Sequence, residues 1–279
     1  MRSPGKIGRT ALFAVAVLVA ILVPQAISSA FLAANLKFTP AIPWSAAVLA
    51  VILWALWIFA DGRFGPQSTA TARHRYLRAN PVPGRTWAWS ITAGLLALGA
   101  LIALWLVLPA PAARLPDYSK YPVITVAVAL VAASVLGAVV EEAGLRGYLF
   151  TRLGELVPPP LAILLVSVLI SPGHGLTQGF ALPVLAWYLL ADIVFGVMSW
   201  LSRSILPGIV VHGLGLLIFF TLIWPTDHVR ASSPLAPSVA AFWIALAVMV
   251  LLALLSLRSF RQLGRATSSV DAPSLLPRS

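Results

Sequence analysis

Two adjacent glutamates, Glu141 and Glu142, stand inside an apolar stretch that runs from Val123 to Phe150, and Arg146 follows one helical turn later. The chain has only 8 acidic residues. A carboxylate at membrane depth costs about 3 kcal/mol or more, so it is rare unless the protein uses it. The pair therefore indicates chemistry rather than packing.

The spacing of these residues predicts different surroundings for the two glutamates. On a helix, Glu142 and Arg146 share a face, which predicts an ion pair that lowers the cost of burying both charges. Glu141 lies about 100° away around the helix axis and is not committed to Arg146. Glu141 is therefore the carboxylate that we expect to be free for reaction.

A histidine in the next apolar stretch is expected to face the glutamates. Glu142 precedes Pro158 by as many residues as His174 follows it, so the two side chains reach a similar depth in an antiparallel helix pair. The residues just before His174, from Ser171 to Gly173, include a proline and a glycine. They predict an irregular backbone there, which membrane proteins tolerate mainly where it lines a cavity or is buried in protein.

Two more ionisable residues lie in apolar stretches. His212 comes soon after Pro207, which predicts a position nearer the cytoplasmic face than the glutamates, so that a tilted helix or a cavity must close the gap. Asp192 is expected either to hydrogen-bond a neighbouring helix or to meet Arg203 at the membrane interface.

These residue types favour the activation of water, and they leave its mechanism open. A buried carboxylate can act as a general base and then as a general acid. A histidine can orient the water, stabilise an oxyanion or bind a metal ion. Two histidines and a glutamate can also form a zinc site with one open position, so a divalent metal such as zinc is one alternative for a cofactor.

The composition indicates a membrane protein. Of the 279 residues, 60% are hydrophobic and only 10% are charged, and the mean hydropathy is +0.95, which excludes a soluble globular domain. The net charge of +11 is distributed over short loops and tails, so we expect the lipid bilayer and no nucleic acid as a partner. The absence of cysteine excludes a thiolate nucleophile and a thiolate metal site.

The apolar stretches predict an all-α, polytopic transmembrane bundle. A helix needs about 20 residues to cross the hydrocarbon. About eight stretches come near this length: Thr10–Ala34, Ile42–Ala60, Thr86–Leu108, Val123–Phe150, Leu161–His174, Phe180–Leu201, Ile205–Trp224 and Val239–Leu257.

The basic residues predict the orientation of these spans. Lys and Arg concentrate in segments that face the cytoplasm if both termini do, while the opposite segments hold only Lys37, Arg114, Lys120 and Arg230. The basic stretch 67–85 is then a cytoplasmic loop, expected to determine topology and nothing more. The tail beyond Ser259 is expected to be disordered. The amino-terminal stretch resembles a signal peptide, but we favour an uncleaved first span, since the apolar sequence continues.

The order of these motifs resembles a known family. The segment from Glu141 to Gly147 reads E-E-A-G-L-R-G, and His174 and His212 follow it. This pattern resembles the CPBP family of intramembrane proteases, which includes type II CAAX prenyl endopeptidases and bacteriocin-processing or immunity-associated, Abi-like bacterial proteins. The first motif of that family, E-E-x-x-x-R, is matched in full. The second, F-x-x-x-H, has Ile170 in place of the aromatic residue, and the third, H-x-x-x-N, has Leu216 in place of Asn.

The resemblance covers residues 123–217 and implies a four-helix catalytic core. We accordingly divide the chain into amino-terminal spans with a basic loop (1–122), a protease-like core (123–224), and a last span with a basic tail (225–279). The resemblance implies an intramembrane endopeptidase that would act on a peptide or a membrane protein. Glu141 would activate the water, Glu142 and Arg146 would support it, and His174 and His212 would assist or bind a metal.

Two alternatives to a protease remain open. In the family, the Asn replaced here by Leu216 is thought to help hold the oxyanion, so the chain could be an inactive relative that acts as a membrane interaction or immunity protein. A proton-coupled transporter could use Glu141, Glu142 and Asp192 as a relay, although the sequence lacks the internal repeat that often marks transporters. The Ala- and Arg-rich composition favours a bacterial plasma membrane.

Overall fold

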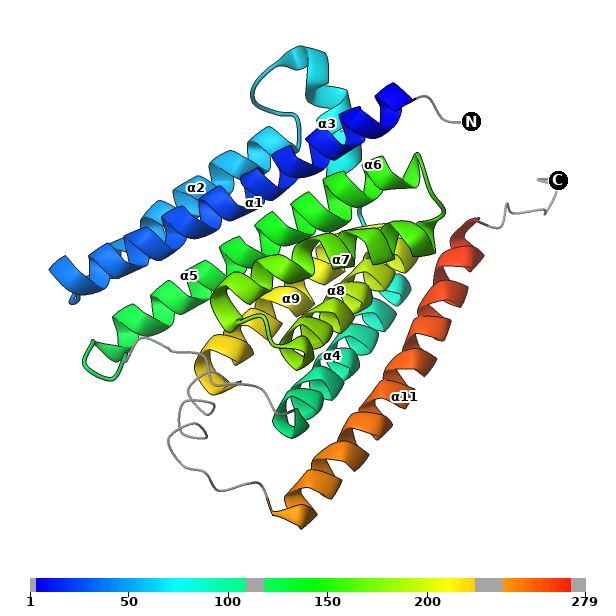
Figure 1. The fold of residues 1–279 in the computed structure, drawn as a ribbon. Coiled ribbons are helices and arrows are strands. Elements are labelled where there is room, and N and C mark those ends of the chain that lie inside the picture. The colour runs from blue at the N-terminus through cyan, green and yellow to red at the C-terminus, as the bar shows by residue number, and fades with distance from the viewer. Residues whose placement is uncertain (1–3, 109–117, 224–237, 272–279) are drawn as a thin grey trace.

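The computed structural model describes residues 4–108, 118–223 and 238–271, and within them it contains helices and no strand. The chain forms an all-α bundle of long helices that run up and down (Figure 1). Their bounds are α1 (Pro4–Phe38), α2 (Trp44–Ala60), α4 (Gly84–Val107), α5 (Val123–Glu141), α7 (Pro159–Gln178), α8 (Leu182–Ser202), α9 (Leu206–Ile218) and α11 (Val239–Asp271). Shorter elements are η1 (Gln67–Thr69), α3 (Ala70–Leu77), η2 (Glu142–Leu149), α6 (Phe150–Gly154) and η3 (Phe219–Ile223).

The lengths of these helices confirm a polytopic membrane protein. Among the described residues, 7 helical stretches are long and apolar enough to span a bilayer. The second of the eight predicted spans is α2, an apolar helix of 17 residues, which falls below that length. The start of α1 and the end of α11 lie at the same end of the bundle (Figure 1).

The helix that carries the glutamates is central. On one side α5 packs against α1 and α2, and on the other side against α9. Helix α8 lies between α7 and α4, and α11 runs along α4 at the edge of the bundle opposite α1 (Figure 1). The four helices that contain all the candidate residues of the predicted core are therefore neighbours.

Glycines at the crossings allow these helices to approach closely. A methyl group on Gly94 of α4 would lie 2.9 Å from Val211 of α9 and 3.0 Å from Met198 of α8. A methyl group on Gly196 of α8 would lie 2.7 Å from Ile163 of α7. Small residues at helix crossings are typical of membrane proteins, where van der Waals packing drives helix association.

Irregular backbone occurs in the glutamate helix and not where the sequence predicted it. The predicted span from Val123 is continuous as far as Gly154, but over Glu142–Leu149 its hydrogen bonding widens to the π-helical i→i+5 pattern. Helix α7 instead continues through Pro172, so the expected irregularity at Ser171–Gly173 is wrong. Widened turns of this kind are rare and often occur at functional sites.

The basic stretch 67–85 does more than determine topology, contrary to our expectation. It contains η1 and α3, and Arg78 follows α3 in the left-handed conformation (φ 56°) and donates a hydrogen bond to the backbone oxygen of Ser199 (3.0 Å). Burial lowers the pKa of the Arg78 guanidinium to about 10. The backbone oxygen of Arg78 accepts a bond from the nitrogen of Ile205 (3.1 Å), so this segment covers the turn between α8 and α9.

The carboxyl-terminal helix is longer than the predicted span. Helix α11 continues to Asp271, so the prediction that the chain is disordered beyond Ser259 is wrong for the residues up to Asp271. Leu263 is fully buried, and the hydroxyl of Thr267 donates to the backbone oxygen of Leu201 (2.8 Å), so this extension packs against the end of α8. The rest of the tail lies outside the described residues.

The contact between α3 and the widened turn gives a test of the fold. A methyl group on Gly147 would lie 2.7 Å from the backbone oxygen of Leu77, which cannot rotate away. We expect Gly147→Ala to lower the free energy of unfolding by about 1–3 kcal/mol through overpacking, measured as a lower thermal midpoint in detergent. Gly154→Ala is the matched control, because nothing lies within 4 Å of its added methyl. Equal midpoints for the two variants would contradict the packing described here.

Candidate active site

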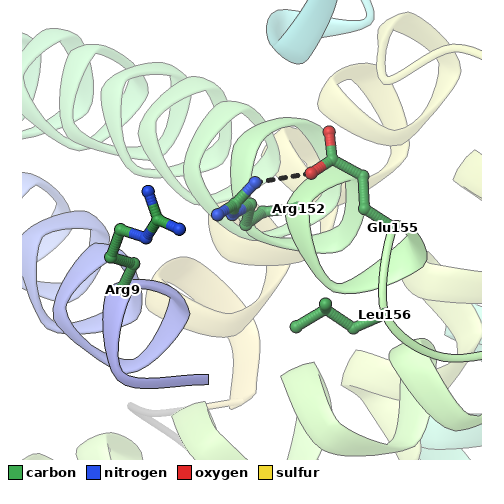
Figure 2. A pocket seen from close by; sticks show the side chains of 4 residues that line it. All are labelled: Arg9, Arg152, Glu155 and Leu156. Atoms are coloured by element: carbon green, nitrogen blue, oxygen red, sulfur yellow. Dashed lines mark hydrogen bonds and ion pairs between the residues drawn. The ribbon is translucent and has the colours of Figure 1, made fainter. Parts of the chain in front are cut away.

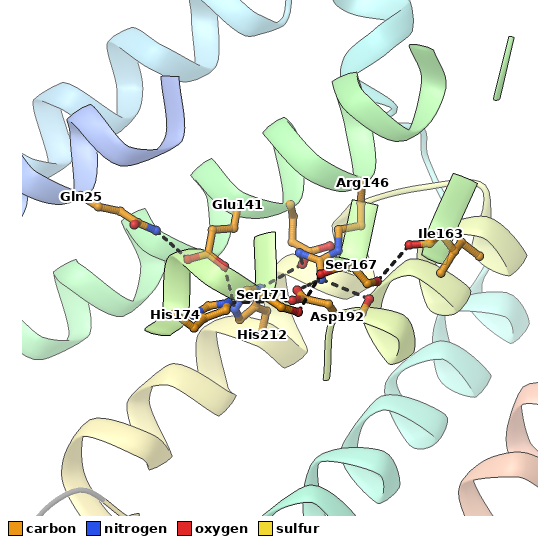
Figure 3. Close-up of polar contacts among 10 residues, drawn as sticks. Gln25, Glu141, Arg146, Ile163, Ser167, Ser171, His174, Asp192 and His212 are labelled. Carbon is orange, nitrogen blue, oxygen red and sulfur yellow. Dashed lines mark hydrogen bonds and ion pairs between the residues drawn. The ribbon is translucent and has the colours of Figure 1, made fainter. Parts of the chain in front are cut away.

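A buried arginine joins two of the core helices. The Nη2 atom of Arg146, on η2, lies 2.5 Å from Oδ1 of Asp192 on α8 (Figure 3). The Nη1 atom of Arg146 lies 3.4 Å from Oε1 of Glu142. The exposed fractions are 1% for Arg146, 0% for Glu142 and 4% for Asp192. The predicted pair of Glu142 and Arg146 is therefore confirmed. Of the two partners predicted for Asp192, a neighbouring helix and Arg203, the first is found. The sequence did not predict that the bonding residue on that helix is Arg146.

His212 lies between the two glutamates. Its Nδ1 is 2.9 Å from Oε1 of Glu142, and its Nε2 is 3.6 Å from Oε2 of Glu141. The imidazole also stacks on the ring of Phe195 at 4.5 Å between centroids. One histidine from α9 thus connects both carboxylates of the first motif.

His212 reaches the glutamates, so the gap that counting from Pro207 predicted is closed. The turn before α9 is covered by protein. Ser204 and Ile205 in that turn are fully buried, and the hydroxyl of Ser204 donates to the backbone oxygen of Asn80 (2.8 Å). Because the segment after α3 covers this turn, α9 begins inside the protein, and its first turns already lie at the level of the glutamates.

Glu141 has a partner that sequence analysis missed. The Nε2 atom of Gln25, on α1, donates a hydrogen bond to Oε1 of Glu141 (2.6 Å; Figure 3). Gln25 is neutral, so a search for ionisable residues in the spans does not find it. The signal in the sequence is a polar amide within the apolar window of α1.

His174 lies at the border of the polar cluster. Its Nε2 is 3.9 Å from Oδ2 of Asp192, and its ring stacks on Tyr188 at 3.9 Å between centroids. Tyr188 in turn packs against Trp187 and Trp105, whose aromatic cluster fills the adjoining part of the bundle. The side chain of His174 is 23% exposed, more than any of its charged neighbours in the cluster. That it faces the glutamates stays a prediction.

Two residues of α9 shape the space around the glutamates. A methyl group on Gly208 would lie 2.6 Å from Oε2 of Glu142, so this position must lack a side chain for Glu142 to keep its place. Leu216, one turn after His212, packs towards α5, where its Cδ1 would lie 3.2 Å from a methyl group on Gly137. An apolar side chain thus occupies the position at which the resembling family carries Asn.

Comparison with known proteins gives one family match, over the part of the chain that holds most of this cluster. Residues 123–218 match the family model of Rce1-like type II CAAX prenyl endopeptidases. The resemblance to CPBP proteases is confirmed. No curated protein and no solved structure gives a significant match. The family match supports a protease-type enzyme in the membrane. We call residues 123–218 the Rce1-like segment. It contains Glu141, Glu142, Arg146, His174 and His212, whereas Gln25 lies outside it.

The Rce1-like segment does not fit a metal site. Within the residues that the structure describes, no three His, Asp or Glu side chains converge to hold a metal ion. Two of the three carboxylates in the cluster, those of Glu142 and Asp192, are paired with the guanidinium of Arg146. Because the guanidinium of Arg146 is positively charged, it would repel a divalent ion bound to the same carboxylate oxygens. We therefore assign the chemistry to the side chains alone.

A surface cavity lies apart from this cluster. It has a volume of about 270 Å³ and is lined by Arg9 at the start of α1 and by Arg152, Glu155 and Leu156 around the end of α6 (Figure 2). Glu155 is held there by the Tyr76 hydroxyl (2.8 Å) and by Arg152 (2.5 Å), and these contacts lower the pKa of its carboxyl. The cavity offers no histidine, so we do not assign the reaction to it.

The pair of Arg146 and Asp192 is the first target for mutation in the Rce1-like segment. Asp192→Ala leaves the buried guanidinium with one carboxylate partner fewer, and we expect it to lower stability by about 3 kcal/mol. Asp192→Asn keeps an oxygen acceptor for Arg146 and should cost about 1–2 kcal/mol. Thermal unfolding of both variants in detergent provides the measurement. If the Ala variant were as stable as the wild type, Arg146 would not depend on this contact.

Proposed function

We propose that this protein is an intramembrane endopeptidase that hydrolyses a peptide bond with a water molecule activated by Glu141. The observation that carries the proposal is the position of His212 between the two glutamates. The 3.6 Å between Nε2 of His212 and Oε2 of Glu141 exceeds a direct hydrogen bond, so a reactant water can bind to both atoms.

The contact with Glu142 orients the imidazole. Because an ionised carboxylate only accepts hydrogen bonds, the 2.9 Å contact favours a proton on Nδ1 of His212. The other nitrogen, Nε2, then turns towards Glu141. This arrangement of base, histidine and orienting carboxylate is a general feature of sites that activate a nucleophile.

The proposed reaction has two steps. Glu141 removes a proton from the water while the water oxygen bonds to the peptide carbonyl carbon, which gives a tetrahedral intermediate with a negatively charged oxygen. Glu141 then gives this proton to the amide nitrogen as the carbon–nitrogen bond breaks, releasing an amine and a carboxylic acid. His174, the most exposed of the ionisable residues in the cluster, is proposed to stabilise the oxyanion.

The proposed substrate is a peptide or a membrane protein that enters the bundle from the bilayer. The proposed location is a bacterial plasma membrane with both termini in the cytoplasm. The basic loop and tail support this orientation through the positive-inside rule. The start of α1 and the end of α11 lie at the same end of the bundle, as this orientation requires (Figure 1).

The roles of Glu141 and His212 can be tested in purified protein. We expect Glu141→Gln and His212→Ala each to lower the rate of cleavage by at least about 100-fold, because each removes a group that acts on the reacting water. The measurement is cleavage of quenched-fluorescent farnesylated CAAX peptides and of single-span membrane substrates in nanodiscs. Glu155→Gln is the control, because this carboxylate lies beyond α6 and should leave the rate unchanged. Full activity in both site variants would refute the proposed reaction.

Leu216 favours one alternative, an inactive relative that binds membrane partners. Asn at this position would present a polar amide one turn from His212. If the leucine has disabled the site, Leu216→Asn should create cleavage in a protein that otherwise has none. If the proposal is correct, the wild type cleaves already, and the substitution alters its rate without creating the activity. The same peptide assay measures both variants.

A further inference from the structure

We infer that Gln25 is a positioning residue for Glu141, so that α1, outside the Rce1-like segment, forms part of the reaction centre. The inference rests on the proposed function, since it assigns Gln25 a role in presenting the base. The contact itself is the hydrogen bond of 2.6 Å from Nε2 of Gln25 to Oε1 of Glu141.

The two oxygens of Glu141 face different helices. Oε1 accepts the bond from Gln25 on α1, and Oε2 faces Nε2 of His212 on α9. A carboxylate without a bond to one oxygen can rotate about its last torsion, which is broad. The bond from Gln25 therefore fixes which oxygen turns towards His212 and the reacting water.

The packing of α1 against the glutamate helix places Gln25 next to Glu141. Val17, Ile21 and Gln25 follow one another at intervals of four residues, so they lie on one face of α1. Val17 and Ile21 are buried against the helix that carries Glu141. A methyl group on Gly144 would lie 2.7 Å from Cδ1 of Ile21, so the missing side chain allows α1 to approach within reach of Glu141.

A purely structural role for Gln25 is the competing explanation. An amide in an apolar span needs a hydrogen-bond partner, and Glu141 provides one. The two roles differ in consequence. A structural contact affects mainly the stability of the bundle, whereas a positioning contact affects kcat through the orientation of the base while substrate binding stays the same.

The test compares Gln25→Met with the wild type. Methionine keeps the length of the side chain and removes the amide. We expect kcat for farnesylated CAAX peptides and single-span membrane substrates to fall by about 10- to 100-fold, the range expected for a hydrogen bond to a charged group. KM should stay within about twofold and the thermal midpoint should not change. Gln25→Glu, which replaces the donor by a second carboxyl group, should reduce kcat at least as much.

Ser28→Ala is the matched control on α1. Ser28 is a buried polar residue one turn after Gln25, and the substitution removes its hydroxyl. We expect it to leave kcat unchanged. Wild-type kcat in Gln25→Met would overturn the inference, and so would an equal loss of kcat in Ser28→Ala, because that loss would reflect packing of α1.

A second measurement keeps the inference testable if the wild type cleaves none of these peptides. Dicyclohexylcarbodiimide, an apolar carboxyl reagent, modifies buried glutamates, and mass spectrometry locates the modified residue. Because Gln25→Met frees Oε1 of Glu141, it should increase labelling of Glu141 several-fold and leave labelling of Glu142 unchanged. Unaltered labelling of Glu141 would overturn the positioning role. Increased labelling without cleavage in the wild type would support the contact while refuting the proposed function.

Discussion

The core of this protein depends on the neutralisation of one buried cation. Arg146 lies where an unpaired guanidinium would be very costly, and its two carboxylate partners come from its own helix and from α8. The pair with Asp192 fixes how α8 faces η2, and the pair with Glu142 places the acceptor for His212. Rotating any of these helices about its axis would leave a charge unpaired, so the ion pairs define their faces more strictly than apolar packing could.

From Arg146 a chain of polar contacts runs through the bundle. It passes from Arg146 to Glu142, then to His212 and Glu141, and ends at Gln25 on α1. The chain fits between close-packed helices because glycines stand beside it, as at Gly208 and Gly144. Polar side chains in a membrane interior need several partners at once, and the missing side chains provide the room for them.

Much of the fold and the centre of the site could be predicted from the sequence. Long apolar stretches require helices in a bilayer, and the spacing of Glu142 and Arg146 on a helix was sufficient to predict their pair. The resemblance assigned His212 to the site, but its contacts with both glutamates could not be predicted, because counting along the sequence does not show that the segment of Arg78 covers the turn at Ile205. The role of Gln25 could not be predicted for another reason. A neutral amide tells nothing of its partner until the packing of α1 is known.

The intrahelical pair also bears on how the chain enters the membrane. The ribosome completes the helix with Glu142 and Arg146 before it reaches Asp192 and His212, so these later partners are absent when that helix meets the hydrocarbon. During that interval Glu142 is the counter-charge that travels on the same helix as Arg146. A span with its own ion pair can thus insert first and acquire its interhelical contacts afterwards. The order of the residues along the chain thereby suits biogenesis as well as the finished site.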